Sequence, residues 1–116
     1  GTMMEVALET KGQLEDEGYS VTLINPRWIK PLDASTITEL SANSKVVCTF
    51  EDHVLYNGFG LSIIELLHDK VIETPVERIG WPDKFIEHGK PEILRKKHGM
   101  TSEAAIGKIL PHLETK

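Results

Sequence analysis

Cysteine and long apolar runs are scarce in this chain, and their scarcity excludes several classes of protein. Cys48 is the single cysteine among 116 residues, so no internal disulfide can form, which is typical of a reducing cytoplasm. No apolar run approaches the ~18 residues of a membrane span. The N-terminus lacks the basic and then apolar regions of a signal peptide. We therefore expect a cytoplasmic protein that does not enter a membrane, with Cys48 as a small buried side chain.

Positive charge is also in short supply. The chain has 13 Lys and Arg residues against 18 Asp and Glu residues, for a net charge of −5. Nucleic-acid binding is carried mainly by Lys and Arg contacts to phosphates, so this balance argues against a nucleic-acid partner.

The sequence motifs of metal sites and of nucleophilic catalysis are absent as well. The five histidines show no metal-ligand spacing, and the chain has no HExxH, no paired cysteines and no G-x-S-x-G elbow. From local chemistry alone, the sequence predicts no metal site and no self-contained active site.

Helical and strand patterns alternate along a chain that has the length and composition of one globular domain. Hydrophobic residues make up 40% and charged residues 27%, which is ordinary for a soluble protein. The first helix is predicted over 3–17, with Thr2 and Glu5 as a capping box, Gly18 at its end, and Met4, Ala7, Leu8 and Leu14 facing inward. Further helices are predicted over 34–42 with Asp33 as N-cap, 60–68, 91–98 and from Thr101 or Ser102 onward, the last weakened by Gly107 and Pro111. Buried strands are predicted over 20–25, 45–50 and 76–80.

This alternation predicts the fold class. Strands that alternate with helices through short connections form a mostly parallel sheet with helices on both faces. We therefore expect one α/β domain over residues 1–116, a three-layer α/β/α arrangement. Three strands make a thin sheet for so many elements.

The stretch from Glu51 to Gly60 is the leading candidate for function. A predicted buried strand delivers Glu51, Asp52 and His53 to one edge of the fold, where open α/β sheets usually meet ligands and partners. Adjacent side chains at a strand end diverge, so at most two of the three point the same way, whereas a catalytic dyad needs convergent groups. We favour a polar surface that forms hydrogen bonds or salt bridges across an interface over an acid–base cluster.

Gly58, Phe59 and Gly60 precede a predicted helix and form a weak phosphate-loop pattern. A dinucleotide fingerprint needs a small residue at position 63, which is Ile63, and it needs the glycines directly after the strand. A turn that lets the helix pack closely is the preferred interpretation, and an anion site at this helix N-terminus stays open as the alternative.

Several motifs resemble those of one enzyme superfamily. Gly1-Thr2-Met3 before a helix, the run Val21–Asp33, and Glu51-Asp52-His53 followed by Gly58-Phe59-Gly60 look like the C-terminal domain of the transketolase-like thiamine diphosphate enzymes. The segment Gly80–Gly89 narrows the resemblance to the 1-deoxy-D-xylulose-5-phosphate synthase family, and the region 95–109 is similar to the tail of that family. The resemblance covers nearly the whole chain.

The resemblance implies a reaction that takes place elsewhere in a larger enzyme. Enzymes of that family condense pyruvate with glyceraldehyde 3-phosphate on thiamine diphosphate and Mg²⁺ for isoprenoid precursor synthesis, and their cofactor motifs lie on two preceding domains. We therefore expect that this chain binds no cofactor alone and is inactive by itself. The family also has two strands before Gly1, so we expect a fragment in which another contact replaces the missing central strand.

The leading hypothesis is thus a non-catalytic domain that packs against the catalytic domains of the same enzyme and supports its homodimer. The residues predicted to dock there are Arg27, Trp28, Lys30, Glu51, Asp52, His53 and Tyr56, because Trp, Arg and Tyr are typical interface anchors. The alternatives are a free-standing anion-binding or regulatory domain that uses Gly58, Phe59 and Gly60, and the C-terminal part of another transketolase-like enzyme.

Overall fold

The computed structural model describes residues 2–24, 34–54, 59–81 and 101–114, with side chains for 3–24, 34–51, 60–80 and 101–114. Within these ranges the elements are α1 (Thr2–Asp16), α2 (Ala34–Ala42), β1 (Val47–Val54), α3 (Phe59–Asp69), β2 (Val76–Trp81) and α5 (Ser102–Glu114). The predicted helix over 91–98 and most of the segment Gly80–Gly89 lie outside the described residues.

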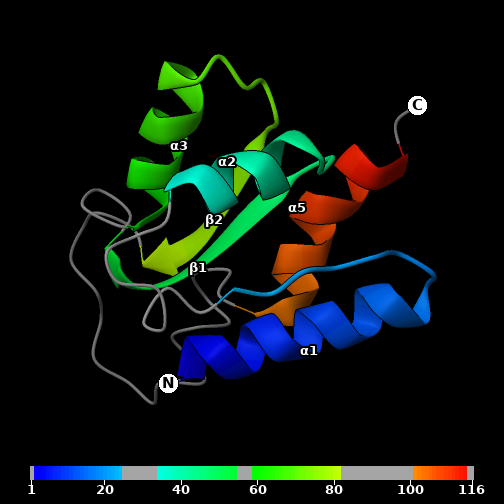
Figure 1. Ribbon diagram of the computed structural model, residues 1–116. Helices are drawn as coiled ribbons and strands as arrows, with labels where there is room; N and C mark the ends of the chain where they lie inside the picture. Colours follow the sequence, from blue (N-terminus) through cyan, green and yellow to red (C-terminus); the bar gives the residue numbers. More distant parts are fainter. Residues whose placement is uncertain (1, 25–33, 55–58, 82–100, 115–116) are drawn as a thin grey trace.

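β1 and β2 form a parallel pair at the centre of the molecule (Figure 1). Val47 lies opposite Val76, and Phe50 lies opposite Ile79. α3 connects the two strands, as expected because parallel neighbours need a long crossover that returns the chain to the same end of the sheet. The predicted parallel pairing of these strands is confirmed.

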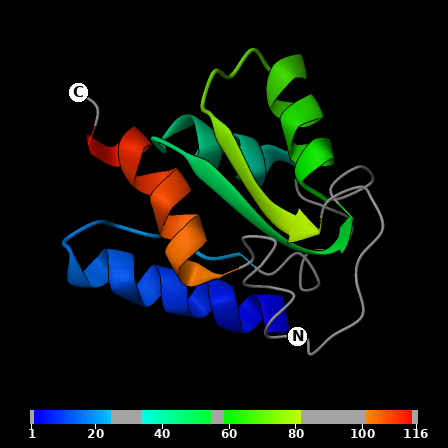
Figure 2. The ribbon, with the colours of Figure 1, turned by 180° about the vertical axis from the view of Figure 1, so that it is seen from behind.

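Helices cover both faces of the strand pair, so the predicted three-layer α/β/α arrangement is confirmed. One cluster joins α1 and α5 to one face through Met3, Leu14, Ile79, Ala105 and Ile109. The second cluster, Ile37, Ile63 and Leu67, joins α2 and α3 to the other face. The view from behind shows α1 and α5 crossing the strands on the side away from α2 and α3 (Figure 2). Alternate strand residues feed the two clusters because successive side chains point to opposite faces.

The strand predicted over 20–25 is wrong for the residues that the structure describes. Residues 20–24 run without regular secondary structure back along α1 (Figure 1), and Val21 packs against the α1–α5 cluster. A strand is defined by ladder hydrogen bonds to a neighbour, and these residues form none with β1 or β2. The apolar pattern therefore indicates partial burial of this segment, with Val21, Leu23 and Ile24 half-buried, and not strand pairing.

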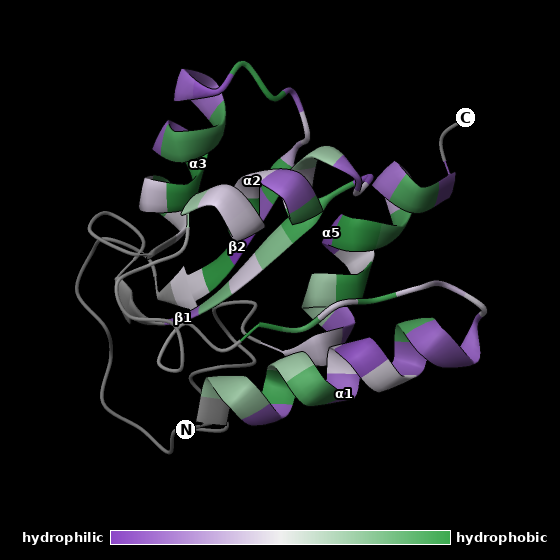
Figure 3. Cartoon of the chain, in the orientation of Figure 1, coloured by the Kyte–Doolittle hydropathy of each residue, from purple (hydrophilic) through white to green (hydrophobic). Residues whose placement is uncertain are grey.

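The inward face of α1 differs from the prediction. Met3, Ala7, Thr10 and Leu14 are buried, whereas Leu8 is 53% exposed. The buried residues follow helical spacing, and the Thr10 hydroxyl is satisfied by the Val6 carbonyl at 2.8 Å. Polar Thr10 completes the buried face, so a prediction from apolar residues alone misplaced that face. Hydrophilic residues are most frequent in the second half of α1 (Figure 3). The helix also begins at Thr2 and not after it, a difference within the usual scatter of helix boundaries.

The remaining boundaries agree more closely, with one functional exception. α2 has its predicted bounds, and Asn43 closes it with a side-chain hydrogen bond to the Glu39 carbonyl. Thr101 caps α5 by accepting a hydrogen bond from the Ala104 amide. β1, however, extends to Val54, so the backbone of Glu51, Asp52 and His53 belongs to the strand and not to a loop after it.

No helix in the described ranges is long and apolar enough to cross a bilayer.

Candidate functional site

Glu51 is the buried charged residue around which the candidate site is built. β1 carries it to the face covered by α3, where it is only 4% exposed. Its Oε2 accepts a hydrogen bond from Thr49 Oγ1 at 2.8 Å, two residues earlier on the same face of the strand. An isolated buried carboxylate would be strongly destabilising, so the remaining contacts of Glu51 decide whether the site is stable.

The first turn of α3 supplies a second donor. The Gly60 amide donates to Glu51 Oε1 at 3.0 Å, so the carboxylate satisfies one of the amides that every helix leaves unpaired at its N-terminus. Negative charge there also complements the helix dipole. A Cβ at position 60 would lie within 3 Å of side-chain atoms of Thr49, Glu51 and Arg78, so any other residue would force these side chains to move. The predicted role of the glycines, close packing at the start of the helix, is confirmed for Gly60.

β2 supplies the counter-charge. Arg78 lies opposite Thr49 in the parallel register, which puts its side chain on the same face as Glu51. Arg78 Nε lies 3.3 Å from Glu51 Oε2, and Nη2 lies 3.4 Å from Oε1, a two-pronged pairing of guanidinium and carboxylate. Both Glu51 oxygens are therefore engaged, an arrangement that suits holding chain segments in place better than proton transfer.

Arg78 was not among the residues predicted from the sequence. Its partner lies 27 positions away, and only the strand register brings the two together. A signal was present, because Arg78 lies in a strand predicted to be buried, and a buried arginine needs an acceptor; the sequence does not identify that acceptor.

The pairing of β1 with β2 becomes irregular after Phe50. Phe50 pairs with Ile79, and Val54 pairs with Trp81. Between these two pairs β1 advances by four residues, whereas β2 advances by two. Extra residues of this kind kink a strand and re-aim its side chains, and they recur near functional sites. Asp52 and His53 lie within this irregular part of the backbone.

The structure tests the other predicted site residues only in part. Arg27, Trp28, Lys30, Tyr56 and Gly58 lie outside the described residues, and only the backbone is described for Asp52, His53 and Phe59. Of the predicted docking set, Glu51 alone has a described side chain. It faces the interior and pairs with Arg78, so its contribution to any docking surface is indirect.

The predicted anion site has an internal occupant at Gly60. The amide that an external anion would use already binds the Glu51 carboxylate. An anion arriving there would meet a negative group and would have to displace it.

The described residues hold no group of three metal-ligating side chains. Burial and the nearby Glu77 carboxylate together raise the pKa of the Cys48 thiol to about 12. Cys48 is half-buried and not fully buried as predicted. A thiol with so high a pKa is a poor nucleophile, and its low reactivity stays a prediction.

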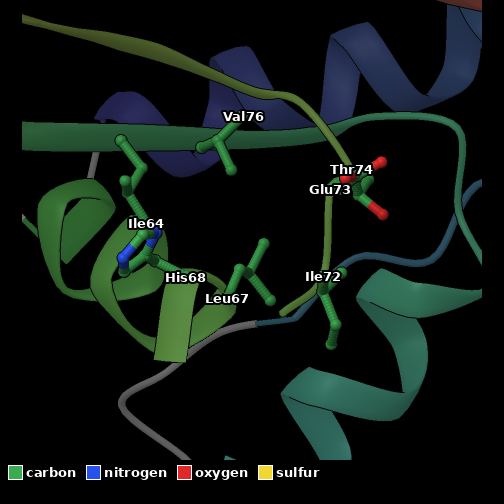
Figure 4. Close-up of a pocket in the computed structure, with 7 residues that line it drawn as sticks. All are labelled: Ile64, Leu67, His68, Ile72, Glu73, Thr74 and Val76. Carbon is green, nitrogen blue, oxygen red and sulfur yellow. The ribbon is translucent and has the colours of Figure 1, made fainter. Parts of the chain in front are cut away.

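A shallow groove lies between α3 and the chain that leads into β2 (Figure 4). Its volume is about 520 Å³, and it is lined by Ile64, Leu67, His68, Ile72, Glu73, Thr74 and Val76. The groove is mostly apolar and contains none of the residues predicted for docking.

Comparison with known families gives one match over most of the chain. The family model described as "Transketolase, C-terminal domain" matches residues 1–105.

Curated relatives agree with this match. The chain is 50% identical over 115 residues to the 1-deoxy-D-xylulose-5-phosphate synthase of Methylacidiphilum infernorum, which covers 97% of this chain and 18% of that protein. It is 42% identical to the enzymes of the same name from Acidobacterium capsulatum, over 97% of this chain, and from Caldanaerobacter subterraneus subsp. tengcongensis, over 95%. The chain spans about a fifth of the length of these relatives, 18% in each case.

A solved structure shares the fold. It is described as "Split gene transketolase, inactive beta4 tetramer", with a TM-score of 0.83 and 28% sequence identity. The match covers 97% of this chain and 37% of that chain.

Proposed function

The chain belongs to the transketolase C-terminal domain family, and from that membership we propose that it is the non-catalytic C-terminal domain of a 1-deoxy-D-xylulose-5-phosphate synthase. The observation that carries the proposal is the 50% identity over 97% of the chain to a protein of that name. The larger enzyme would condense pyruvate with glyceraldehyde 3-phosphate. The cytoplasmic location stays a prediction.

The cofactors of that reaction, thiamine diphosphate and Mg²⁺, would be held by other domains. One described feature supports this division. The helix N-terminus that the sequence offered as an anion site is that of α3, and its Gly60 amide is paired with the buried Glu51 carboxylate. A diphosphate would meet like charge there.

The role proposed for this domain is docking. The C-terminal end of β1 and the segment that follows it would face the catalytic domains of the same enzyme or of its homodimer mate. Asp52, His53 and Tyr56 would make contacts from that segment, and Arg27, Trp28 and Lys30 from the segment after residue 24. Strand-end surfaces in α/β folds are the usual place for such contacts.

Two measurements test the proposal. The full-length protein should form 1-deoxyxylulose 5-phosphate from pyruvate and glyceraldehyde 3-phosphate, and the isolated 116-residue chain should not. Isothermal titration of the isolated chain with thiamine diphosphate and with sugar phosphates should show no binding heat. Saturable binding of either would favour the free-standing anion-binding alternative.

His53→Ala separates docking from catalysis in the full-length enzyme. We expect it to weaken dimerisation, measured by analytical ultracentrifugation, more than it slows turnover at saturating substrate. Normal dimerisation with a pure loss of kcat would instead indicate a catalytic role for His53.

A further inference from the structure

Exposed apolar side chains gather on one side of α3. Among the described residues, the large hydrophobic side chains that stay exposed are Leu8 and three that lie on α3 or just after it, Leu61, Ile64 and Val71. Leu61, Ile64 and His68 follow the spacing i, i+3, i+7, which lines up side chains along one side of a helix. Single exposed apolar residues are normal on protein surfaces, whereas contiguous ones mark contact sites.

This row of side chains borders the apolar groove beside α3. Ile64 and His68 belong to both, and Leu67, Ile72 and Val76 continue the apolar lining (Figure 4). Val76 is the first residue of β2, so the groove lies at the N-terminal end of the strands. We call the groove and the row that borders it the α3 face; the row consists of Leu61, Ile64, His68 and Val71.

Val71 is strained and is not stabilised by burial. Its φ is 57°, in the left-handed region that is unfavourable for a β-branched side chain. The side chain is 85% exposed, so no burial within the domain offsets the strain. Strained residues cluster at functional positions. A partner that covered the α3 face would bury Val71 and provide that offset.

Two carboxylates border the α3 face. Glu65 follows Leu61 by four residues and precedes His68 by three, so it adjoins the row, and Glu73 lines the groove. Both are exposed, and neither forms an ion pair with another residue in the described ranges. A partner with Lys or Arg next to its apolar side chains would match these charges.

The same charges argue against a second copy of the chain as the partner. A twofold contact places one surface against itself, so the Glu65 and Glu73 carboxylates of both copies would meet. Like charges brought together in this way oppose association. The remaining source is the rest of the same polypeptide: the chain spans 18% of the length of its relatives, so most of a protein of that kind lies outside it.

We propose that the α3 face packs against another domain of the same polypeptide, through a segment that presents apolar side chains next to Lys or Arg. This inference rests on the proposed function for the existence of that longer polypeptide. It adds a second contact surface, at the opposite end of the strands from the end of β1.

The test measures access to the α3 face in the full-length enzyme. Val71→Cys and Leu8→Cys each place a thiol at an exposed position, and Leu8 lies on α1, across the strand pair from α3. Labelling by N-ethylmaleimide is followed by mass spectrometry of the peptides, which separates these thiols from Cys48. Val71 is 85% and Leu8 53% exposed, so exposure within the domain alone predicts faster labelling at position 71. The proposal predicts the reverse, with labelling of Val71→Cys at least about tenfold slower than that of Leu8→Cys, because a covered thiol is inaccessible.

Charge reversal tests the chemistry of the partner. Glu65→Lys and Glu73→Lys, combined with Val71→Cys, should raise labelling at position 71 to the rate of Leu8→Cys, because they repel the cations of the partner. Glu65→Gln and Glu73→Gln should act in the same direction with a smaller effect. Both positions are exposed, so the domain should stay folded, which an unchanged Tm would verify.

Equal labelling of Val71→Cys and Leu8→Cys would mean that the α3 face is uncovered and would overturn the proposal. Protection that survives charge reversal would overturn the basic partner, and protection that is lost on dilution would indicate a second copy instead. An enzyme that lacks synthase activity but still protects position 71 would defeat the proposed function and leave this inference standing.

Discussion

At the scale of single residues, Gly60 has less room than the other glycines for which the space at Cβ is described. A Cβ there would lie 2.5 Å from Arg78 Nε, 2.6 Å from Glu51 Oε2 and 2.7 Å from Thr49 Oγ1. Gly60→Ala should therefore destabilise the domain by about 1–3 kcal/mol, the usual range for overpacking, although alanine is the better helix former. Urea unfolding measures the change.

Gly107 provides the matched control for this substitution. It lies within α5, and nothing approaches its Cβ position within 4 Å. Gly107→Ala should be neutral or stabilising by up to ~1 kcal/mol, because only helix propensity changes. Equal stability of Gly60→Ala and wild type would show that the packing of Gly60 against Glu51 is looser than described.

The Cys48 thiol gives a prediction about pH. Its pKa is raised from 9.0 to about 12 by burial and by Glu77. The folded protein therefore holds the proton more tightly than the unfolded chain. The resulting stability is fully present below pH 9 and is lost as pH rises from about 9 to about 12. Cys48→Ala should reduce this alkaline loss, measured by urea unfolding at several pH values.

The same thiol can be examined by its reactivity. At pH 8 a disulfide reagent should modify Cys48 far more slowly in the folded protein than in urea, because the reactive species is the thiolate. Equal rates in both states would contradict the burial and the raised pKa together.

The candidate site could be predicted from the sequence only where its signals are local. An acidic residue after an apolar run marked Glu51, and a glycine before a helix marked Gly60. Arg78 could not be found this way, because its role depends on which strands are neighbours and in what register. The alternation of side chains along a strand predicts the face of the sheet on which a residue lies. The residue that it contacts on that face depends on the tertiary structure.

At the scale of elements, α1 and α3 end in the same motif with different residues. Gly18 and Val71 occupy the left-handed position, with φ of 94° and 57°. In each case the next residue reaches back five positions, Tyr19 to Leu14 and Ile72 to Leu67, as a Schellman motif requires. Glycine is suited to this backbone, and a β-branched residue is strained there.

Substitutions at the two helix ends should therefore have opposite effects. Val71 is 85% exposed, so Val71→Gly loses little apolar burial and should stabilise the domain by about 1 kcal/mol, since a non-glycine residue in this conformation costs about 1–2 kcal/mol. Gly18→Ala should destabilise it by a similar amount. Thermal unfolding followed by circular dichroism measures both changes.

Gly12 serves as the reference for these helix-end variants. It lies inside α1 with open space around its Cβ position, so Gly12→Ala should stabilise by ~1 kcal/mol through helix propensity alone. If Gly18→Ala behaved like Gly12→Ala, the left-handed end of α1 would be refuted.

Element boundaries could be predicted where local chemistry sets them. Asn43 ends α2 and Thr101 starts α5, each through its own hydrogen bond. The segment 20–24 shows the limit, because its β-branched residues signal burial and a strand also needs a partner edge. The buried face of α1 was misjudged for a related reason, since a hydrogen-bonded Thr10 can be buried as fully as a leucine.

At the scale of the whole molecule, two apolar clusters pack against opposite faces of the same strand pair. Met3, Leu14, Ile79, Ala105 and Ile109 lie on one face, and Ile37, Ile63 and Leu67 on the other. The sequence predicted this layered division through its alternation of helices and strands. It could not predict the irregular end of β1, because the register of β1 with β2 is a property of the tertiary structure.

Because both clusters pack against the same two strands, we can predict how cooperatively the domain unfolds. Ile109→Val and Ile63→Val each remove one methylene group from a different cluster and should each cost about 0.5–1.5 kcal/mol. No residue belongs to both clusters, so the double variant should show the sum of the two losses within about 0.5 kcal/mol. All three variants should still unfold in one urea transition, because both clusters depend on β1 and β2. Two separate transitions would mean that the layers on the two faces fold as independent units, and a coupling beyond about 0.5 kcal/mol would mean that strain passes through the strands from one face to the other.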